Sequence, residues 1–288
     1  MRILFYVLGQ LPLPVLHGIG ALIGWAMWLF PSSRRRVALT NIRHCLPELP
    51  LQRQRLLARR GLIHEMKSIA ELPFFWLGPK DKLLASVRET HGEELVEQAL
   101  AQGKGLILLT LHLGGFEAPG HVYASKRPIT GIYKPQGGVI EELSVNGRKR
   151  TGAKLVQAVG GGVRKVVEAL LKNKETIYFM PDQDPPEGRG VFAPFFGVSA
   201  HSPVLVCKLA QRAGAPVLFM YAERLDWGRG YIAHYRAAPP GMDDPDLVKA
   251  VTAMNAGLEA CVRARPEQYW WGYRRFRRRP PGKPPFYE

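Results

Sequence analysis

The chain has 288 residues and a net charge of +16, from 40 Lys and Arg against 24 Asp and Glu. Hydrophobic residues make up 46% of it, which supports a packed core and excludes wholesale disorder. Its three cysteines (Cys45, Cys207 and Cys261) lie far apart, which argues against a disulfide framework and a structural zinc site. So positive a chain is expected to meet an acidic partner: nucleic acid, an anionic membrane surface or an acidic carrier protein.

The N-terminal segment is strongly apolar. No Asp, Glu, Lys or Arg occurs from Ile3 to Ser33, and Pro12 and Pro14 interrupt the run. The 16 residues between Pro14 and Pro31 span about 24 Å as a helix, whereas a bilayer core is about 30 Å thick. The segment therefore predicts one kinked membrane span or a shallow re-entrant or interfacial helix, with a signal peptide and a buried core helix as alternatives.

A basic stretch follows this apolar segment. It contains Arg34, Arg35, Arg36, Arg43, Arg53, Arg55, Arg59 and Arg60. By the positive-inside rule these arginines predict that the bulk of the chain lies on the cytoplasmic side of a membrane. They also favour anionic lipid headgroups, by about 1 kcal/mol for each basic residue near the surface. No nucleic-acid-binding motif accompanies them, so a nucleic-acid partner is not expected.

The rest of the chain alternates between helix and strand patterns. Helices are predicted within 34–72 and over 93–101, 163–171, 204–212 and 245–262. Strands are predicted over 105–111, 129–133, 176–180, 215–222 and 231–236. The unbroken apolar run over 105–111 is typical of a strand buried on both faces. The alternation predicts an α/β fold with a mixed, largely parallel sheet flanked by helices, together with an N-terminal apolar, membrane-associated helix.

Three segments follow from this organisation. Residues 1–33 are expected to form a membrane anchor or interfacial helix, 34–280 one catalytic domain, and 281–288 a tail. Arg and Pro are so frequent from residue 277 onward that the chain is expected to be flexible there.

Residues with catalytic chemistry follow the first predicted strand. His112 stands at its C-terminal end, where α/β sheets bind ligands, and Glu117 comes five residues later, across Gly114 and Gly115. Across a strand–turn–helix connection the carboxylate can hold the imidazole in one tautomer and make it a general base toward a hydroxyl. The backbone N–H groups of the two glycines are candidates for an oxyanion site. On spacing alone, a strand-end histidine with an ordinary surface glutamate is the alternative.

Other polar residues end strands or lie in loops. Arg148 offers a planar fork for a phosphate or carboxylate, and Lys134 is a second phosphate candidate. Asp182 ends a strand, where it orients Arg148 or a catalytic loop, or simply caps a turn. Asp182 and Asp184 also read as the D-x-D of a metal-dependent glycosyltransferase, an alternative disfavoured because two prolines follow at once. The run 160–165 lacks the ending of a phosphate-binding loop and predicts a turn before a helix.

Aromatic and basic residues elsewhere have two interpretations each. Trp227, Trp270 and Trp271 belong either at a membrane interface or in the core. The arginines of 274–279 either contact anionic lipid or an acidic carrier protein, or form a solvated basic tail.

Several motifs together resemble the bacterial lipid A late acyltransferases, the lauroyl- and myristoyl-transferring branch of the H-x-x-x-x-D/E lysophospholipid-acyltransferase superfamily. The motifs are the H-x-x-x-x-E box at 112–117, G-R-K-R at 147–150, P-D-Q-D at 181–184, P-F-F-G at 194–197 and P-E-Q-Y-W-W at 266–271. The resemblance extends from the apolar N-terminus to Pro280. The chain departs from the family pattern in the small Gly-Gly pair within the box and in its short, proline-broken N-terminal part.

The resemblance implies roles for particular residues. It makes His112 the general base and Glu117 its partner, and it makes Arg148 and Asp182 essential. Substrate contacts are expected from Gly114, Gly115, Lys134 and Arg150. No cofactor and no metal are implied.

The resemblance also implies a reaction. A fatty acyl group would pass from an acyl carrier protein thioester to a hydroxyl of a lipid A precursor of the Kdo2-lipid IVA type, an anionic glycolipid at the membrane surface. This is a secondary acylation in lipopolysaccharide biosynthesis. The alternative acceptors are a lysophospholipid and a phosphatidylinositol mannoside. A basic membrane-surface or nucleic-acid-binding protein without enzymatic activity is the alternative from another class.

Overall fold

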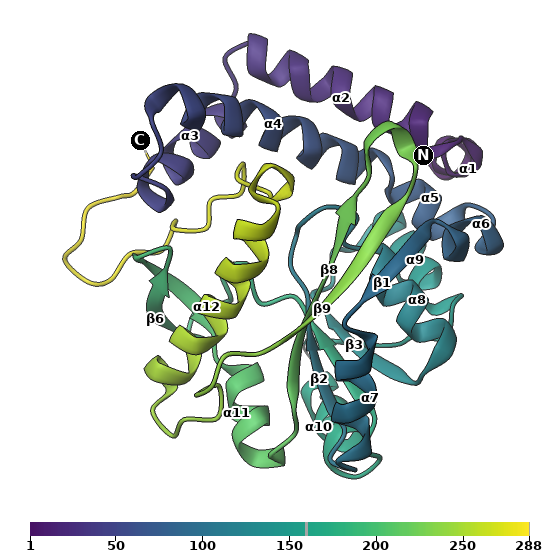
Figure 1. The fold of residues 1–288 in the computed structure, drawn as a ribbon, viewed down its shortest axis with the longest axis vertical. Helices are drawn as coiled ribbons and strands as arrows, with labels where there is room; N and C mark the ends of the chain where they lie inside the picture. Colours follow the sequence, from purple (N-terminus) through teal and green to yellow (C-terminus); the bar gives the residue numbers. More distant parts are fainter. Residues whose placement is uncertain (159–160, 288) are drawn as a thin grey trace.

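A seven-stranded sheet with the strand order β1-β9-β8-β2-β5-β3-β4 forms the centre of the protein (Figure 1). The structure is a computed structural model, and it describes residues 1–158 and 161–287. The strands are β1 (Val87–His91), β2 (Leu106–Leu109), β3 (Ile129–Tyr133), β4 (Lys154–Gln157), β5 (Thr176–Phe179), β8 (Val217–Arg224) and β9 (Tyr231–Ala237). Five neighbouring strands from β8 to β4 are parallel, β9 is antiparallel to β8, and β1 is parallel to β9. The predicted mixed, largely parallel sheet is confirmed.

Helices cover both faces of this sheet. They are α3 (Ser33–Cys45), α4 (Leu51–Ala70), α5 (Leu72–Leu77), α6 (Lys80–Ala85), α7 (Glu93–Ala101), α8 (Ala118–Lys126), α9 (Gly138–Lys149), α10 (Gly162–Leu171), α11 (Leu205–Ala213) and α12 (Leu247–Ala264). The central strand β2 is fully buried, as its sequence predicts. Its residues Ile107 and Leu109 join the core beneath α10, α11 and α12, whereas Leu106 and Leu108 pack with α7 and α8.

The elements that the sequence did not predict are edge strands and short elements. Strands β1 and β4 occupy the two edges of the sheet, where their polar and half-exposed residues lack a strong apolar signal. A separate antiparallel hairpin is formed by β6 (Gly190–Phe195) and β7 (Val198–Pro203), with the P-F-F-G motif at its turn. Helix α8 begins directly after Glu117, where the strand–turn–helix connection predicts a helix, whereas α9 was not predicted.

The N-terminal apolar segment forms two helices, α1 (Arg2–Gln10) and α2 (Leu13–Leu29), which meet at a bend of 120°. Helix α2 lies along α4 on the outside of the molecule (Figure 1). Within the described residues, no helix is long and apolar enough to cross a membrane by itself, and the bent α1–α2 pair meets that test only jointly.

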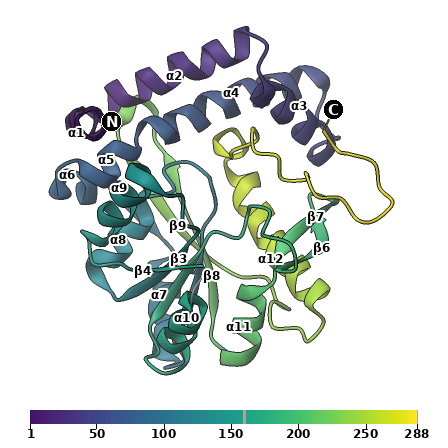
Figure 2. The ribbon, with the colours of Figure 1, turned by 180° about the vertical axis from the view of Figure 1, so that it is seen from behind.

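The C-terminal tail returns to the body of the protein and packs on it (Figure 2). The Tyr287 hydroxyl donates to Oδ1 of Asn41 at 2.6 Å and accepts from the backbone N–H of Phe276 at 3.1 Å. Phe286 packs on the core and on the ring of Phe276. The flexibility expected from residue 277 onward is therefore not observed up to residue 287, because aromatic residues at the end of the tail anchor it. Glu288 lies outside the described residues.

Candidate active site

The partly buried His112 and the buried Asp182 form a pair at the C-terminal edge of the sheet. His112 follows β2 and Asp182 follows β5, and these strands are parallel neighbours, so their carboxyl ends meet. Nδ1 of His112 lies 3.0 Å from Oδ1 of Asp182. The backbone N–H of His112 donates to Oδ2 of the same carboxylate at 2.9 Å. Asp182 thus fixes both the main chain and the ring of His112.

The pKa of Asp182 is lowered although the carboxyl group is buried. Burial by itself raises the pKa of this carboxyl, but the charge of His112 and the two hydrogen bonds from that residue outweigh it and lower the pKa. An ionised Asp182 only accepts hydrogen bonds, so in the neutral imidazole Nδ1 of His112 carries the proton and Nε2 has the lone pair. The arrangement can therefore accept a proton at Nε2.

Aromatic rings enclose the imidazole, whose side chain is 16% exposed. The ring centroids of Phe116 and Trp270 lie 5.2 and 4.8 Å from that of His112. The side-chain amide nitrogen of Gln183 lies 3.3 Å from Nε2. The imidazole thus has two aromatic neighbours and one amide group close to Nε2.

Glu117 and Arg148 form a second pair. Glu117 is the N-cap residue of α8, and Arg148 lies in the last turn of α9. Nε of Arg148 donates to Oε2 of Glu117 at 3.0 Å and its terminal nitrogen to Oε1 at 2.5 Å, so the contact is bidentate. Burial opposes the charge of each group, but the partner's charge dominates: the pKa of Glu117 is lowered and that of Arg148 is raised.

The pairing differs from the one expected from the sequence. We expected Glu117 to orient His112, and Asp182 to orient Arg148 or a catalytic loop. In the structure the two acids exchange these partners, because the chain turns sharply after His112. This turn is held by bridges from Leu113 to Tyr269 and from Gly114 to Ala222. It directs Glu117 toward α9 and leaves Nδ1 of His112 to β5.

The two backbone N–H groups that we expected to form an oxyanion site donate to carbonyl oxygens of the protein instead. The N–H of Gly114 donates to the carbonyl oxygen of Gln268 at 3.1 Å, and that of Gly115 donates to the carbonyl oxygen of Ala222 at 3.0 Å. The two glycines serve close packing instead. A Cβ on Gly114 would lie 1.9 Å from the Ala222 oxygen, and one on Gly115 would lie 2.2 Å from the Tyr231 ring.

Arg150 and Lys134 do not join the two pairs. Arg150 donates to the carbonyl oxygens of Phe74, Phe75 and Gly78, which end α5. It therefore caps a helix rather than offering a free guanidinium to a substrate. Lys134 is exposed directly after β3, at the same edge of the sheet as His112.

The two aspartates of the D-x-D pattern serve different basic groups. Asp184 accepts from His201 at 2.8 Å and from Arg277 and Arg278, so it ties the C-terminal segment to the loop that carries Asp182. Arg275 of the basic cluster is buried and donates to the carbonyl oxygen of His201. Arg275, Arg277 and Arg278 therefore hold the C-terminal segment on the body of the protein and do not form a fully solvated tail.

The three tryptophans considered for a membrane interface have different environments. Trp271 is buried in the core, and Trp270 lies beside His112. Trp227 is 87% exposed. Only Trp227 is placed where an interface could receive it.

A buried ion-pair network that the sequence analysis missed supports the turn after His112. Arg224, at the end of β8, binds Glu71 through two nitrogens at 2.7 and 3.0 Å. It also donates to the carbonyl oxygen of Gly114 at 2.7 Å, as does the hydroxyl of Ser68 at 2.8 Å. His17 of α2 lies 2.9 Å from Glu71. In the sequence Glu71 directly precedes the apolar run 72–77, and Arg224 follows an apolar strand together with Glu223, so no local pattern distinguished this pair from other charges beside apolar segments.

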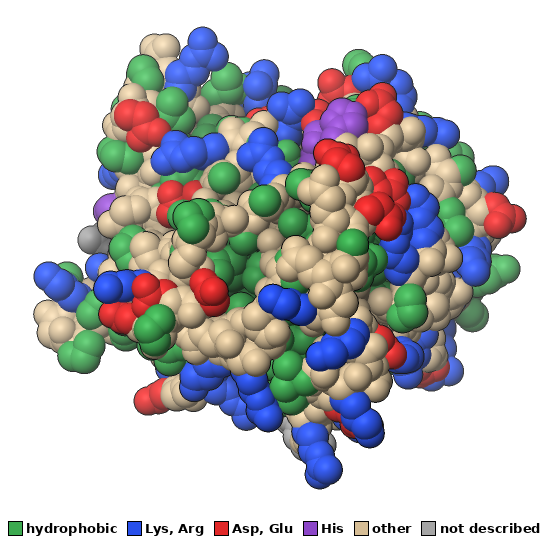
Figure 3. Space-filling model, turned by 60° about the horizontal axis from the view of Figure 1, so that its bottom comes forward, with side chains coloured by type: hydrophobic (Ala, Val, Ile, Leu, Met, Phe, Trp, Pro, Cys, Tyr) green, Lys and Arg blue, Asp and Glu red, His purple; other side chains and the backbone are tan. Residues whose placement is uncertain are grey.

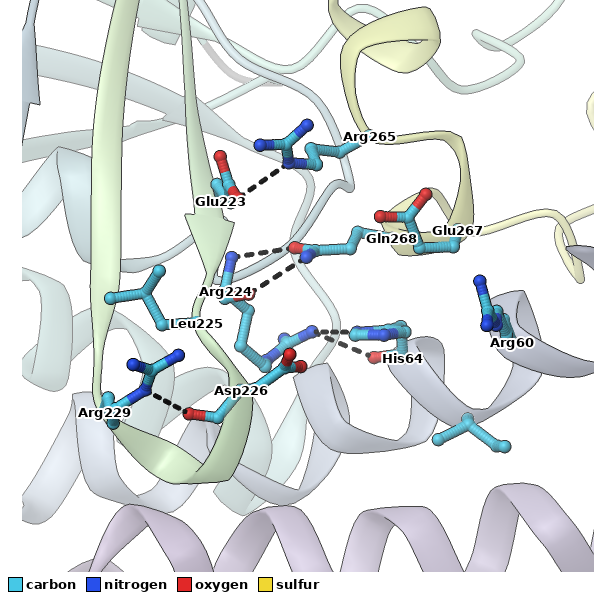
Figure 4. Close-up of a pocket in the computed structure, with 11 residues that line it drawn as sticks. Arg60, His64, Glu223, Arg224, Leu225, Asp226, Arg229, Arg265, Glu267 and Gln268 are labelled. Carbon is cyan, nitrogen blue, oxygen red and sulfur yellow. Dashed lines mark hydrogen bonds and ion pairs between the residues drawn. The ribbon is translucent and has the colours of Figure 1, made fainter.

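A cavity of about 470 Å³ adjoins this network (Figure 4). Arg224 and Gln268, both bonded to Gly114, line it together with Arg60, Asp226 and Arg265. The described lining does not include His112. The cavity therefore lies next to the turn after His112, and its described lining does not contain the His112–Asp182 pair.

The chain is similar to known proteins over nearly its whole length. A family model described as bacterial lipid A biosynthesis acyltransferase matches residues 1–278. A lipid A biosynthesis lauroyltransferase of Escherichia coli K12 is 29% identical over 282 residues, which are 96% of this chain and 90% of that protein. The palmitoleoyltransferase of the same organism is 27% identical with the same coverage, and its myristoyltransferase is 25% identical over 94% of this chain and 82% of that protein. This protein therefore belongs to the bacterial lipid A biosynthesis acyltransferase family, whose members are enzymes that transfer acyl groups.

Proposed function

We propose that the protein transfers a fatty acyl group from an acyl carrier protein thioester to a hydroxyl of a lipid A precursor of the Kdo2-lipid IVA type. We further propose that it acts at the cytoplasmic face of the inner membrane. The observation that carries the chemistry is the His112–Asp182 pair, in which the carboxylate holds Nδ1 and Nε2 is the nitrogen that can accept a proton. The family supplies the acyl transfer and the lipid A precursor.

In the proposed reaction Nε2 of His112 takes the proton of the acceptor hydroxyl. The hydroxyl oxygen attacks the thioester carbonyl carbon, a C–O bond forms and the C–S bond breaks. The imidazolium then returns its proton to the leaving thiolate. Asp182 stabilises the imidazolium through its negative charge at 3.0 Å, as a buried carboxylate does for a catalytic histidine.

Arg148 is proposed to bind an anionic group of a substrate. Its side chain is 27% exposed, and Glu117 holds the guanidinium by two hydrogen bonds. A fixed, partly exposed guanidinium suits phosphate, which lipid A precursors and the carrier's prosthetic group both carry. Glu117 is then a positioning residue for Arg148.

Transfer of radiolabelled acyl groups by the purified protein tests the proposal. Carrier-protein thioesters from decanoyl to palmitoyl are offered with a tetra-acylated lipid A precursor in detergent. Product that disappears with His112→Ala supports donor, acceptor and base together. No product with any thioester contradicts the lipid A assignment, and the same donors are then offered to a lysophospholipid and a mannosylated phosphatidylinositol.

A further inference from the structure

A hydrophobic surface covers the outer side of α1 and α2. On α2 the buried residues Leu13, Leu16, His17, Gly20 and Gly24 recur at helical spacing and face the body of the protein. Gly20 and Gly24 lie against α4, whereas Leu13 and Leu16 pack in the core cluster that includes α5. The exposed large hydrophobic residues of this region are Ile3, Leu4, Tyr6, Val7, Val15, Ile19, Leu22, Ile23, Trp25, Leu29 and Phe30. Exposure of so many on adjoining elements is unusual for a surface that faces only water.

The turn between β8 and β9 extends this surface. Gly228 lies against Pro14 at the start of α2, since a Cβ on Gly228 would be 2.4 Å from the Pro14 nitrogen. The neighbouring Trp227 is 87% exposed and has φ of 59°, a left-handed conformation that costs a large side chain energy. The turn reaches the corner between α1 and α2 in Figure 1. A strained, exposed tryptophan is thus held beside the apolar helices.

Arginines lie against aromatic residues of α2. The guanidinium of Arg59 lies 4.9 Å from the ring centroid of Trp25, and that of Arg35 lies 4.8 Å from the ring centroid of Trp28. Tryptophan with neighbouring basic groups is typical of residues at the depth of the lipid headgroups. There the ring contacts both water and acyl chains, and the cation binds lipid phosphate. The charges on this side therefore complement an anionic bilayer.

The packing of α2 on α4 opposes a transmembrane orientation. At Gly20 and Gly24 the two backbones approach so closely that a Cβ would lie 2.6 Å from Lys67 and 2.5 Å from Ile63. A spanning α2 would have to leave α4 or take it into the hydrocarbon. Helix α4 carries Arg53, Arg55, Arg59, Arg60 and Lys67, and each such charge costs at least about 2.5 kcal/mol at the bilayer centre.

We propose that α1, α2 and the 226–229 turn form one interfacial docking surface for a bilayer that contains anionic lipids, and that it enters the headgroup–acyl boundary without crossing the membrane. The proposal deepens the membrane location given under the proposed function. The lower face of the molecule contrasts with this surface: in Figure 3 its hydrophobic side chains lie in small groups among charged ones.

Depth-dependent fluorescence quenching tests the proposal. The native cysteines are buried, so Leu22→Cys, Trp227→Cys and the control Val248→Cys each offer one exposed site for an environment-sensitive dye. Val248 is also an exposed hydrophobic residue, in the first turn of α12 at the other end of the molecule (Figure 1). The labelled full-length proteins are mixed with phosphatidylethanolamine–phosphatidylglycerol vesicles that carry nitroxides at a shallow or a deep position.

We expect the shallow nitroxide to quench the labels at residues 22 and 227 more than the deep one does, and neither to quench the label at 248. Stronger deep quenching at residue 22 would establish a spanning α2 and overturn the proposal. Equal quenching at 248 would show adsorption without a defined surface and would also overturn it.

Vesicle sedimentation with unlabelled variants gives a second measurement. Leu22→Glu and Trp227→Ser are each expected to weaken binding at least about tenfold, whereas Val248→Glu leaves it unchanged. If Leu22→Glu instead converts a dimer to a monomer without vesicles, the surface binds a second copy of the chain and the proposal fails. Neither measurement uses donor or acceptor, so the docking surface and the acyl-transfer chemistry succeed or fail separately.

Discussion

At the scale of single residues, the candidate site contains two carboxylates with different partners. Asp182 and Glu117 are both almost fully buried, yet one holds an imidazole and the other a guanidinium. An imidazole can lose and regain a proton near neutral pH, whereas a guanidinium stays charged. The first pair therefore suits proton transfer and the second suits charge recognition.

Asp182→Asn should lower kcat by about 10²- to 10⁴-fold, because an amide leaves the imidazolium without a stabilising charge. His112→Ala should cost a similar factor, and the double variant should be little worse than either single one, since the two groups act as a unit. Steady-state kinetics with the carrier-protein thioester measures this. Losses that multiply in the double variant would contradict a shared role. The exposed Glu94→Gln serves as the control.

Glu71→Gln should destabilise the fold by about 3–5 kcal/mol, because Arg224 stays buried without a counter-charge. Burial by itself raises the pKa of Glu71, but the Arg224 charge and the hydrogen bonds from His17 and Arg224 lower it to about 2. Denaturant unfolding measures the change. The matched control is Glu168→Gln, which breaks an exposed helical pair with Lys172 and should cost less than about 1 kcal/mol. Equal costs would show that the buried network is dispensable.

At the scale of elements, the packing of α2 is linked to the turn after His112. Helix α2 packs on α4, and its His17 contacts Glu71. Glu71 in turn binds Arg224, which donates to the carbonyl oxygen of Gly114. Its contact face depends on small residues, because glycine lets two helix backbones approach closely. Loss of this contact would remove a support of the turn after His112.

Gly24→Ala should destabilise the protein by about 1–3 kcal/mol, because the new Cβ would lie 2.5 Å from the Ile63 backbone. Gly18→Ala is the matched control on the same helix, since a Cβ there meets nothing within 4 Å. It should be neutral or stabilising by up to about 1 kcal/mol. Thermal or denaturant unfolding separates the two. A Gly24→Ala protein as stable as the Gly18→Ala protein would show that α2 does not pack on α4 in solution.

At the scale of the whole molecule, acid should unfold this protein progressively. Burial lowers the pKa of His17, His64, His121 and His234 below 6.5, and cationic partners lower the pKa of Glu71, Glu117 and Asp182 despite burial. For each of these groups the unfolded chain binds protons at a higher pH than the folded one, so stability rises with pH. Glu259 acts in the opposite direction, because burial raises its pKa.

The midpoint of thermal unfolding is therefore expected to fall as the pH drops from about 6.5, first through the histidines and below about 4.5 through the carboxylates. Differential scanning fluorimetry across this range measures it. In Glu71→Gln the decline below about 4.5 should be shallower, because one carboxylate no longer has to be protonated. A midpoint that is constant down to pH 4 would contradict the assigned shifts.

Local pattern was sufficient for much of this protein. The buried strand β2, the helix α7 and the strand β3 follow from apolar runs and periodicity, because burial on one or two faces constrains residue type directly. The candidates His112 and Asp182 are predicted from their place after strands, and the candidates Glu117 and Arg148 from their motifs; their roles stay predictions. The motifs also predict the family, and the match of the family model to residues 1–278 confirms that prediction.

Only the tertiary structure decided how these residues pair. Which carboxylate meets His112 depends on β2 and β5 being neighbours and on the turn through Gly114, and both follow from contacts between residues distant in sequence. The same applies to Glu71 and Arg224, which lie 153 positions apart and meet in the core. Short-range pattern determines what a segment can become; long-range packing selects the partners of its side chains, and the chemistry of the site depends on those partners.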